Sequence, residues 1–367
     1  MTIVSGGKGV RTQENAKPLI VNGSMDVAQR GTSKTSASGY TTVDRFRNFL
    51  DDGVVTATQE SLTSGNAFIN GFANAFKLDV TTADGTVANN HIGGIQYKFE
   101  GQDLQVFKKG TANAEKFTVA FWIKSTKTGT YICELEDEDN SRNNSQSYTV
   151  SSSNTWEHKV VNFPADTTGA FGDDSGNSLK LNWFIMAGTD YTSGTLQEAW
   201  GSETAANRCV GQVNALDNTS NNIHITGVQM EVGEYSSTTL PPFQHESFGD
   251  NLTRCMRYYY RATGRCGFGA GTGFVQDGAV KGYIYHTMPV APRAEMSFSL
   301  SGTSAAILSI DGNAGDDVQS IAAAYSDVLP FKDYEFNFVT DGSSITDKCG
   351  MGIRVNASNY IECSAEL

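Results

Sequence analysis

Apolar and polar residues alternate in short runs along most of the chain. From Phe117 to Lys124 an apolar residue occupies every second position, and these residues alternate with Thr118, Ala120, Trp122 and Lys124. The same alternation recurs over 179–185, 228–232, 296–300 and 334–338. A period of two is that of a β-strand with one buried and one solvated face. The pattern therefore predicts an all-β protein whose antiparallel sheets pack face to face.

One segment has the period of a helix instead. Apolar side chains recur at 252, 255, 256 and 259, which is the spacing of an amphipathic helix, and Asp250 is its expected N-cap. The preceding Leu-Pro-Pro-Phe run ends any strand, because proline cannot join a central ladder. We therefore predict four parts: an N-terminal docking arm over 1–19, a first β domain over 20–245, a hinge helix over 246–262 and a smaller second β domain over 263–367.

Composition agrees with this fold class and narrows the range of partners. Glycine is abundant, at 38 residues, and only 18% of residues are charged, which is typical of short strands joined by polar turns. The net charge of −13 argues against a nucleic-acid partner, since phosphate binding depends on lysine and arginine. It argues equally against docking on an anionic membrane, and no stretch approaches the ~20 apolar residues that span a bilayer.

The cysteines predict no disulfide framework. Their positions are Cys133, Cys209, Cys255, Cys266, Cys349 and Cys363, with no C-x-x-C pair. The first residues lack a basic region followed by an apolar run, so we expect no signal peptide and folding in a reducing cytosol. Free, buried thiols are the interpretation that follows.

Five segments resemble those of bacteriophage tail-fibre and virion structural proteins. They are LIVNGSMDVAQRGT (19–32), GYTTVDRF (39–46), ITGVQMEVG (225–233), PFQHESFGDNLTRCMRYY (242–259) and IECSAEL (361–367). Between them, 117–125, 154–157 and 181–188 resemble strands of jelly-roll carbohydrate-binding modules. The resemblance implies a homotrimeric virion protein with an N-terminal jelly-roll β-sandwich, a short hinge helix and a smaller C-terminal β-sandwich. A jelly roll also protects its sheet edges, which suits a subunit present in many copies.

Aromatic residues of the first domain offer a chemistry for glycan binding. A sugar ring packs its apolar face on an aromatic side chain, while its hydroxyls need fixed polar partners. Trp122 lies on the polar side of its strand, Trp156 and Trp200 lie near strand–loop junctions, and Tyr191 lies in a loop. These four residues are the predicted glycan contacts. The alternative is that each packs into the core or beneath a loop, as we expect for Trp183.

A run of carboxylates over 134–140 raises the question of a metal. Ca²⁺ takes about six to eight oxygen ligands, and jelly-roll sugar-binding domains often hold a structural calcium. Glu136, Asp137 and Asp139 are the candidate ligands. The run lacks the alternating Asp/Asn spacing and central glycine of a calcium loop, so a solvated acidic loop is the favoured alternative. No other cofactor is expected.

Nothing in the sequence singles out a catalytic site. Glycan hydrolysis needs two carboxylates about 5 Å apart, or about 6.5–9.5 Å apart, across a cleft. Glu157, Glu198 and Glu231 are scattered acids with no spacing that marks a pair. There is no G-x-S-x-G or H-E-x-x-H motif, and the five histidines are dispersed. We therefore expect no enzyme, and a glycan depolymerase is the least favoured function.

Two basic groups predict contacts between subunits, because arginine pairs with carboxylates in a two-pronged geometry and the body of the chain is acidic. They are Lys8, Arg11 and Lys17 in the arm, and Arg254, Arg257 and Arg261 on one face of the predicted helix. The alternatives are a frayed, solvated terminus and the solvent-facing side of an amphipathic helix.

Together these features lead us to expect a structural subunit of a phage particle, either a tail fibre or a surface appendage, that binds host-surface glycans. Its other partners would be copies of itself and other virion proteins. The alternative is a capsid decoration or cement protein, or another architectural virion protein, without a ligand. Both hypotheses place the protein in the virion after synthesis in the bacterial cytoplasm.

Overall fold

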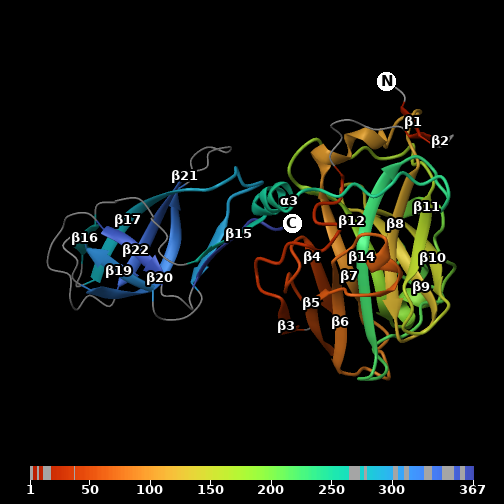
Figure 1. Cartoon of the computed structure of the whole chain (residues 1–367), viewed down its shortest axis with the longest axis horizontal. Helices are drawn as coiled ribbons and strands as arrows, with labels where there is room; N and C mark the ends of the chain where they lie inside the picture. Colours follow the sequence, from red (N-terminus) through yellow and green to blue (C-terminus); the bar gives the residue numbers. More distant parts are fainter. Residues whose placement is uncertain are drawn as a thin grey trace.

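The computed structural model of this chain is mostly β-sheet (Figure 1). It describes residues 18–36, 38–261, 288–299 and 360–367 with their side chains. Elsewhere it describes only the backbone pairing of strands, at 3–5, 8–10, 262–263, 273–276, 279–287, 300, 305–309, 314–325, 333–340 and 351–355. Helices within these ranges are few and short, as the alternating pattern predicts.

Two antiparallel six-stranded sheets form a sandwich from residues 33–232. The first sheet runs in the order β13 (Gly201–Ser202), β10 (Arg142–Val150), β9 (Gly129–Asp137), β12 (Asn177–Ala187), β7 (Ile92–Glu100) and β4 (Phe46–Leu50). The second runs in the order β11 (Glu157–Phe163), β8 (Phe117–Ser125), β14 (Asn222–Val232), β6 (Asn74–Thr82), β5 (Val54–Ser61) and β3 (Ser33–Ser36). The alternating runs at 117–124, 179–185 and 228–232 thus lie in β8, β12 and β14.

The core of the sandwich consists of the inward side chains of both sheets. Phe121 of β8 meets Trp183 of β12 with ring centroids 5.7 Å apart, at an edge-to-face angle of 82°. Trp183 is 1% exposed, which confirms the prediction that it belongs to the core. Phe46 of β4 packs on Tyr97 of β7 at 5.1 Å in the same layer. Burial of these large side chains is the main stabilising term, at about 25 cal/mol per Å² of apolar surface.

Further strands follow the sandwich. A three-stranded sheet joins β15 (Tyr259–Thr263), β23 (Tyr360–Ser364) and β18 (Ser297–Leu300). Another antiparallel sheet runs in the order β16 (Gly273–Gln276), β17 (Ala279–Thr287), β21 (Asp333–Thr340), β20 (Ala314–Tyr325), β19 (Ala305–Ser309) and β22 (Met351–Val355). At the start of the chain, β1 (Ile3–Ser5) pairs with β2 (Lys8–Val10). The predicted domain limits at 20–245 and 263–367 stay a prediction.

The hinge helix is shorter than the sequence predicts. Helix α3 spans Phe248–Met256, and its N-cap is Ser247, whose hydroxyl accepts the Asp250 N–H at 3.2 Å, rather than Asp250. The chain then turns, and Tyr259 begins a strand, β15, that pairs with β23. Pairing with a distant strand thus overrides the helical period of residues 257–262. Figure 1 shows α3 between the sandwich and the later strands, with the C-terminus beside it.

The other helices lie in connections of the sandwich. Helix α1 (Gly65–Ile69) joins β5 to β6, and a 3-10 helix, η1 (Gly101–Phe107), follows β7. Helix α2 (Thr189–Thr192) and a second 3-10 helix, η2 (Ala205–Asn207), lie in the long connection from β12 to β14. None of the helices in the described part of the chain has the length and apolar character of a membrane span.

Four cysteines of the described residues are buried and form no disulfide, namely Cys133, Cys209, Cys255 and Cys363. This agrees with the prediction of free thiols. Burial raises the pKa of the Cys133 thiol well above its usual value, so it is protonated and unreactive. Cys266 and Cys349 lie outside the described residues.

Candidate functional site

Trp122 lies on the outward side of the second sheet. Along β8, Phe121 and Ile123 are buried in the core, whereas Trp122 and Lys124 are half-buried and point away from it. This confirms the prediction that Trp122 lies opposite Phe121. The side chain packs against a small apolar cluster formed by Leu62, Ala67, Phe72, Ala75 and Trp156. Its ring is therefore held in place but not enclosed.

A histidine from the neighbouring strand lies beside this tryptophan. His158 of β11 is directly opposite Trp122 in the antiparallel register, and the two ring centroids are 4.9 Å apart with planes inclined by 35°. Burial lowers the pKa of His158 below its usual value. The imidazole is therefore neutral at neutral pH, and the two rings form one continuous aromatic surface.

Trp156 lies beneath this surface rather than on it. It is only 6% exposed, and α1 covers it closely: a β-carbon on Gly65 would lie 2.8 Å from Trp156 Cδ1. Gly65 also has a φ of +90°, so only glycine fits this approach without strain. On the other side, the Lys124 Nζ lies 5.3 Å from the centre of the indole ring. Trp156 therefore packs beneath the surface formed by Trp122 and His158. Packing beneath a loop was the alternative to its predicted role as a glycan contact.

The next row of the sheet supplies charged and polar groups. His224 of β14 lies opposite Lys124 of β8 on one side and Lys77 of β6 on the other. The His224 Nε2 lies 2.8 Å from Glu60 Oε2, and the Lys77 Nζ lies 2.8 Å from Asp79 Oδ2. We call the outward side of β11, β8, β14, β6 and β5 the Trp122 face; its side chains are Trp122, Lys124, His158, His224, Lys77 and Glu60.

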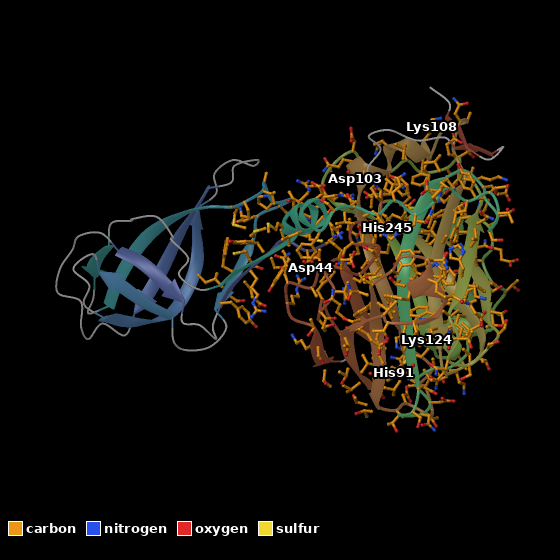
Figure 2. All side chains as sticks on the ribbon, viewed as in Figure 1. Asp44, His91, Asp103, Lys108, Lys124 and His245 are labelled. Atoms are coloured by element: carbon orange, nitrogen blue, oxygen red, sulfur yellow. The ribbon has the colours of Figure 1, made fainter. Side chains whose placement is uncertain are left out.

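Burial and hydrogen bonding fix the charges of this face. Burial lowers the pKa of His224, so the neutral ring donates its Nε2–H to Glu60. The hydrogen bond from His224 lowers the pKa of Glu60 to about 2, so this carboxylate is ionised at neutral pH. Burial also lowers the pKa of Lys124. The face thus offers one anionic acceptor and cationic donors beside the aromatic surface. Figure 2 places Lys124 toward the end of the sandwich that also carries His91.

Trp200 and Tyr191 lie elsewhere on the sandwich. The indole Nε1 of Trp200 donates to the Pro164 carbonyl at 2.7 Å, and its ring packs 5.9 Å from Phe117 at the edge of the core. Tyr191 lies in α2 and packs on the outward side of the first sheet, against a cluster that contains Phe184. Of the four predicted glycan contacts, the structure brings together only Trp122 and Trp156.

The acidic run at 134–140 is only partly the expected solvated loop: residues 134–137 are buried in β9, and residues 138–140 form a turn at the surface. Glu134 and Glu136 point outward from β9, and Arg208 binds both: its Nε lies 3.0 Å from Glu134 Oε2 and its Nη2 lies 2.8 Å from Glu136 Oε2. Lys180 of β12 approaches the other oxygen of Glu136 at 3.1 Å. Burial opposes ionisation of Glu136, but Arg208 and Lys180 outweigh it and lower its pKa to about 2.

Asp137 and Asp139 are occupied in other directions. Asp137 points to the opposite side of β9 from Glu136 and binds Lys109, whose side chain is 0% exposed. Asp139 is exposed and accepts the Gly172 N–H at 2.8 Å. Since neighbouring residues of a strand face opposite sides, Glu136 and Asp137 cannot ligate one ion together. The structure therefore does not bring the three candidate calcium ligands together.

The arginines of the hinge bind groups of the same chain, and the predicted contacts with another subunit stay a prediction. Arg257 makes a two-pronged pair with Glu100, at 2.9 Å from Nε to Oε1 and 2.6 Å from Nη2 to Oε2. Arg254 binds Glu246 at 2.7 Å. Arg261 donates to the carbonyl of a glutamine in the N-terminal segment and stacks 3.3 Å above the Tyr360 ring. Lys8 belongs to β2, while its side chain, Arg11 and Lys17 lie outside the described residues.

These arginines lie where three segments that are distant in sequence meet. The segments are residues 18–30, α3 with β15, and residues 360–367, and we call this region the junction. Asn251 Nδ2 donates to Asn22 Oδ1 at 3.2 Å, and Gln29 Nε2 donates to the Tyr259 carbonyl at 2.8 Å. Arg30 binds Glu366 at 3.1 Å. Three of the segments that resemble phage proteins therefore meet in one place.

Sequence reasoning missed several side chains of the Trp122 face. Alternation over 117–124 put Lys124 on the same side as Trp122, but neither Lys124 nor His158 was among the predicted glycan contacts. The contact of His224 with Glu60 joins residues 164 positions apart in the chain and has no local signal.

Comparisons with known proteins give distant similarities. No family model matches the chain, and no curated protein matches it. Among solved structures, the chain is similar to the enzymatically active domain of tailspike protein 4 of bacteriophage CBA120, with 13% identity over 59% of this chain and a TM-score of 0.30. The chain covers 21% of that tailspike chain.

Two further similarities are to carbohydrate-binding structures of Clostridium thermocellum. The family 11 carbohydrate-binding module of a cellulosomal cellulase matches 56% of this chain and 97% of its own, with 9% identity and a TM-score of 0.27. A xylanase with CBM22-1 and GH10 modules, complexed with xylohexaose, matches 57% of this chain and 30% of its own, with 12% identity and a TM-score of 0.28. At these TM-scores the similarities assign neither a family nor a function.

Proposed function

We propose that this chain is a structural subunit of a bacteriophage particle, a tail fibre or surface appendage, whose jelly-roll sandwich binds host-surface glycans at the Trp122 face. The observation that carries the glycan part is the half-buried Trp122 ring, which is flanked by the neutral ring of His158. A sugar can pack its apolar C–H face on such a surface while its hydroxyls meet side chains at the edge.

The surroundings of Trp122 support this role. Its ring packs on the cluster around Phe72 and Trp156 and lies beside His158, so little side-chain freedom remains to be lost on binding. Lys124 offers N–H donors and Glu60 offers carboxylate oxygens in the adjacent rows of the sheet. Both kinds of group are needed, because a sugar hydroxyl donates one hydrogen bond and accepts others.

The phage part of the proposal rests on the resemblance of the segments around the junction. Segments 19–32, 242–259 and 361–367 resemble phage structural proteins and are in contact in this fold. Such contacts give a physical reason for the three segments to occur together in one kind of protein. A homotrimer, contacts with other virion proteins, a location in the virion and the absence of enzymatic activity belong to the same proposal.

A capsid decoration protein without a ligand is the second candidate. It is favoured by the exposed apolar side chains of α1, Phe68 at 44% and Ile69 at 78%, which are typical of a protein contact. Labelling of the protein on intact particles separates the two candidates. Label confined to the tail or to appendages supports the fibre, and label over the whole head supports the decoration protein.

Replacement of Trp122 by alanine is expected to weaken glycan binding about tenfold. Aromatic contacts contribute about 0.5–1.5 kcal/mol beyond area burial, and ~1.4 kcal/mol is a factor of ten in affinity. A glycan array with the full-length protein identifies the sugar, and isothermal titration with that sugar then measures the affinity. The Trp122→Phe variant should bind with intermediate affinity, since it keeps part of the ring surface.

The matched control is Tyr191→Ala, which removes a half-buried aromatic side chain from the outside of the other sheet. We expect it to bind as the wild type does. Equal loss of affinity in both variants, or none in Trp122→Ala, would show that the sugar does not lie on the Trp122 face. An array without any signal would favour the decoration protein.

A further inference from the structure

Three side chains of types that ligate metals meet at one end of the sandwich. Asp52 lies in the turn between β4 and β5, and Asp84 and His91 lie in the loop between β6 and β7. One potential ligand atom from each lies within 4.8 Å of the others. Figure 2 shows His91 at this end of the molecule. None of these residues belongs to the acidic run at 134–140, whose members were the predicted calcium ligands.

Two of these side chains have buried atoms without a hydrogen-bond partner. Asp84 is 9% exposed; its Oδ1 accepts the Thr86 N–H at 3.2 Å, but its Oδ2 is buried and unpaired. The Nδ1 of His91 is also buried and makes no hydrogen bond, and it faces Asp52 Oδ2 at 3.8 Å. A buried carboxylate oxygen without a partner costs about 1–3 kcal/mol or more, so such atoms call for an explanation, and a bound cation supplies one.

The backbone around the three side chains is held firmly. Asp51 joins the turn to the start of β7, because its N–H donates to the Ile92 carbonyl at 3.2 Å and its Oδ2 accepts the Ile92 N–H at 2.9 Å. The Gly188 N–H donates to the His91 carbonyl at 2.7 Å. Asn214 Nδ2 donates to the Asp84 carbonyl at 2.7 Å. A fixed backbone is what a metal site needs to keep its ligands in place.

A glycine brings the two loops together. Gly53, directly after Asp52, has a φ of +76°, and a β-carbon there would lie 3.1 Å from the Thr82 carbonyl oxygen and 3.8 Å from Asp84 Cβ. Any other residue would be strained and would press on the loop that carries Asp84. The Asp-Gly sequence of the turn thus allows Asp52 to approach Asp84 and His91.

We infer that Asp52, Asp84 and His91 form a binding site for a divalent first-row transition metal ion, of which Zn²⁺ is the probe of choice. One imidazole nitrogen and two carboxylate oxygens suit Zn²⁺, whereas Ca²⁺ and Mg²⁺ select oxygen ligands alone. Zn²⁺ sits about 2.0–2.2 Å from such ligands, so a small rotation of the exposed Asp52 side chain completes the set. Water fills the remaining position.

Bound metal would join the β4–β5 turn to the β6–β7 loop. This site is independent of the proposed glycan binding, because its three residues lie in loops and not on the Trp122 face. A plain ion pair between protonated His91 and Asp52 is the competing explanation of the 3.8 Å contact. It accounts for Asp52 and His91 but leaves Asp84 Oδ2 without a partner.

Isothermal titration of Zn²⁺ into the metal-stripped full-length protein tests the inference. We expect one Zn²⁺ per chain, with binding lost in His91→Gln and in Asp84→Asn, and no comparable binding of Ca²⁺ or Mg²⁺. The control variants are His245→Gln, a histidine from another part of the molecule, and Asp173→Asn, an exposed aspartate; both should bind Zn²⁺ as the wild type does. Asp52 is the most exposed ligand, so Asp52→Asn should fold normally and still weaken binding about tenfold or more.

X-ray absorption at the zinc edge supplies the second measurement. Coordination by nitrogen and oxygen alone, with one imidazole, is the expected result. Coordination by sulfur would place the metal on cysteines and overturn the inference. Unchanged Zn²⁺ binding in folded His91→Gln and Asp52→Asn would overturn it as well.

Discussion

Replacement of Arg208 by methionine is expected to lower the free energy of unfolding of the sandwich by about 3–5 kcal/mol, because it leaves buried carboxylates without their cation. Glu134 is 0% exposed, and Arg208 is the cation that the described structure gives it, with contacts at 2.5 Å and 3.0 Å. Among the described residues, Glu136 would keep Lys180 as its cation and Asn182 as a neutral donor. Asn143 and Ser145 also donate to Glu134, but neutral donors do not balance a buried charge. Urea unfolding followed by tryptophan fluorescence measures the change, since all four tryptophans lie within 122–200.

The control for this prediction is Glu203→Gln. Glu203 is the more exposed partner of Arg208, and its side chain is 34% exposed. Its replacement should change the free energy of unfolding by less than about 1 kcal/mol. If Arg208→Met cost no more than this control, the carboxylates would have to be neutral or hydrated in the folded state.

The pH dependence of stability checks the same charges. Glu136 has a folded-state pKa of about 2 against an ordinary value of 4.5, so its stabilising contribution is complete above pH ~4.5 and is lost as the pH falls toward 2. The Arg208→Met variant should lose less stability over this pH interval than the wild type. Without Arg208, the folded-state pKa of Glu136 lies closer to its ordinary value.

Replacement of Arg45 by methionine is expected to destabilise the junction by a similar amount, about 3–5 kcal/mol. Arg45 is 1% exposed, and its guanidinium lies 3.4 Å above the Tyr258 ring and 5.0 Å from the Tyr97 ring. It also binds Glu366 at 2.5 Å and the Lys98 carbonyl at 2.7 Å. These contacts join the turn before β4, and β7, to Tyr258 between α3 and β15 and to the last residues of the chain. Loss of the cation should therefore release the C-terminal residues as well as weaken the sandwich.

A double-mutant cycle with Glu366→Gln separates the ion pair from packing. The double variant should lose less free energy of unfolding than the two single variants lose together, because residues in direct contact are coupled. Arg47→Met is the matched control, since Arg47 lies in β4 two residues after Arg45, its guanidinium lies 5.9 Å from the Tyr40 ring, and it has no ion pair among the described residues. Strict additivity, or an equal loss in the control, would mean that the buried pair does not hold the junction together.

Local alternation was enough to predict the strands and the two sides of β8. Successive side chains of a strand point to opposite sides, so the side that a residue faces follows from its immediate neighbours in sequence. Phe121, Trp122 and Trp183 were therefore placed correctly from the sequence. The helix was overextended for the opposite reason. The period of residues 250–260 is a local property, but the fate of Tyr259 depends on β23, about a hundred residues further along the chain.

Charged partners could not be predicted, because they come from distant positions. The acidic run at 134–140 looked like a solvated loop, yet the cation on Glu134 comes from Arg208, 74 residues later. The hinge arginines have no acid among them in sequence, and the pairing of Glu100 with Arg257 across 157 positions has no local signal. Asp52, Asp84 and His91 likewise have no spacing that marks a metal motif. Their proximity follows from the pairing of β4, β7, β5 and β6 alone.

The most direct test of glycan binding at the Trp122 face uses the indole N–H signals of the four tryptophans in protein labelled with ¹⁵N-tryptophan. Single Trp→Phe variants assign the signals, and the sugar found on the array is then titrated into the full-length protein. The Trp122 signal should move with increasing sugar while that of the core residue Trp183 stays in place. A sugar that binds with the Trp122 signal unmoved would contradict the account.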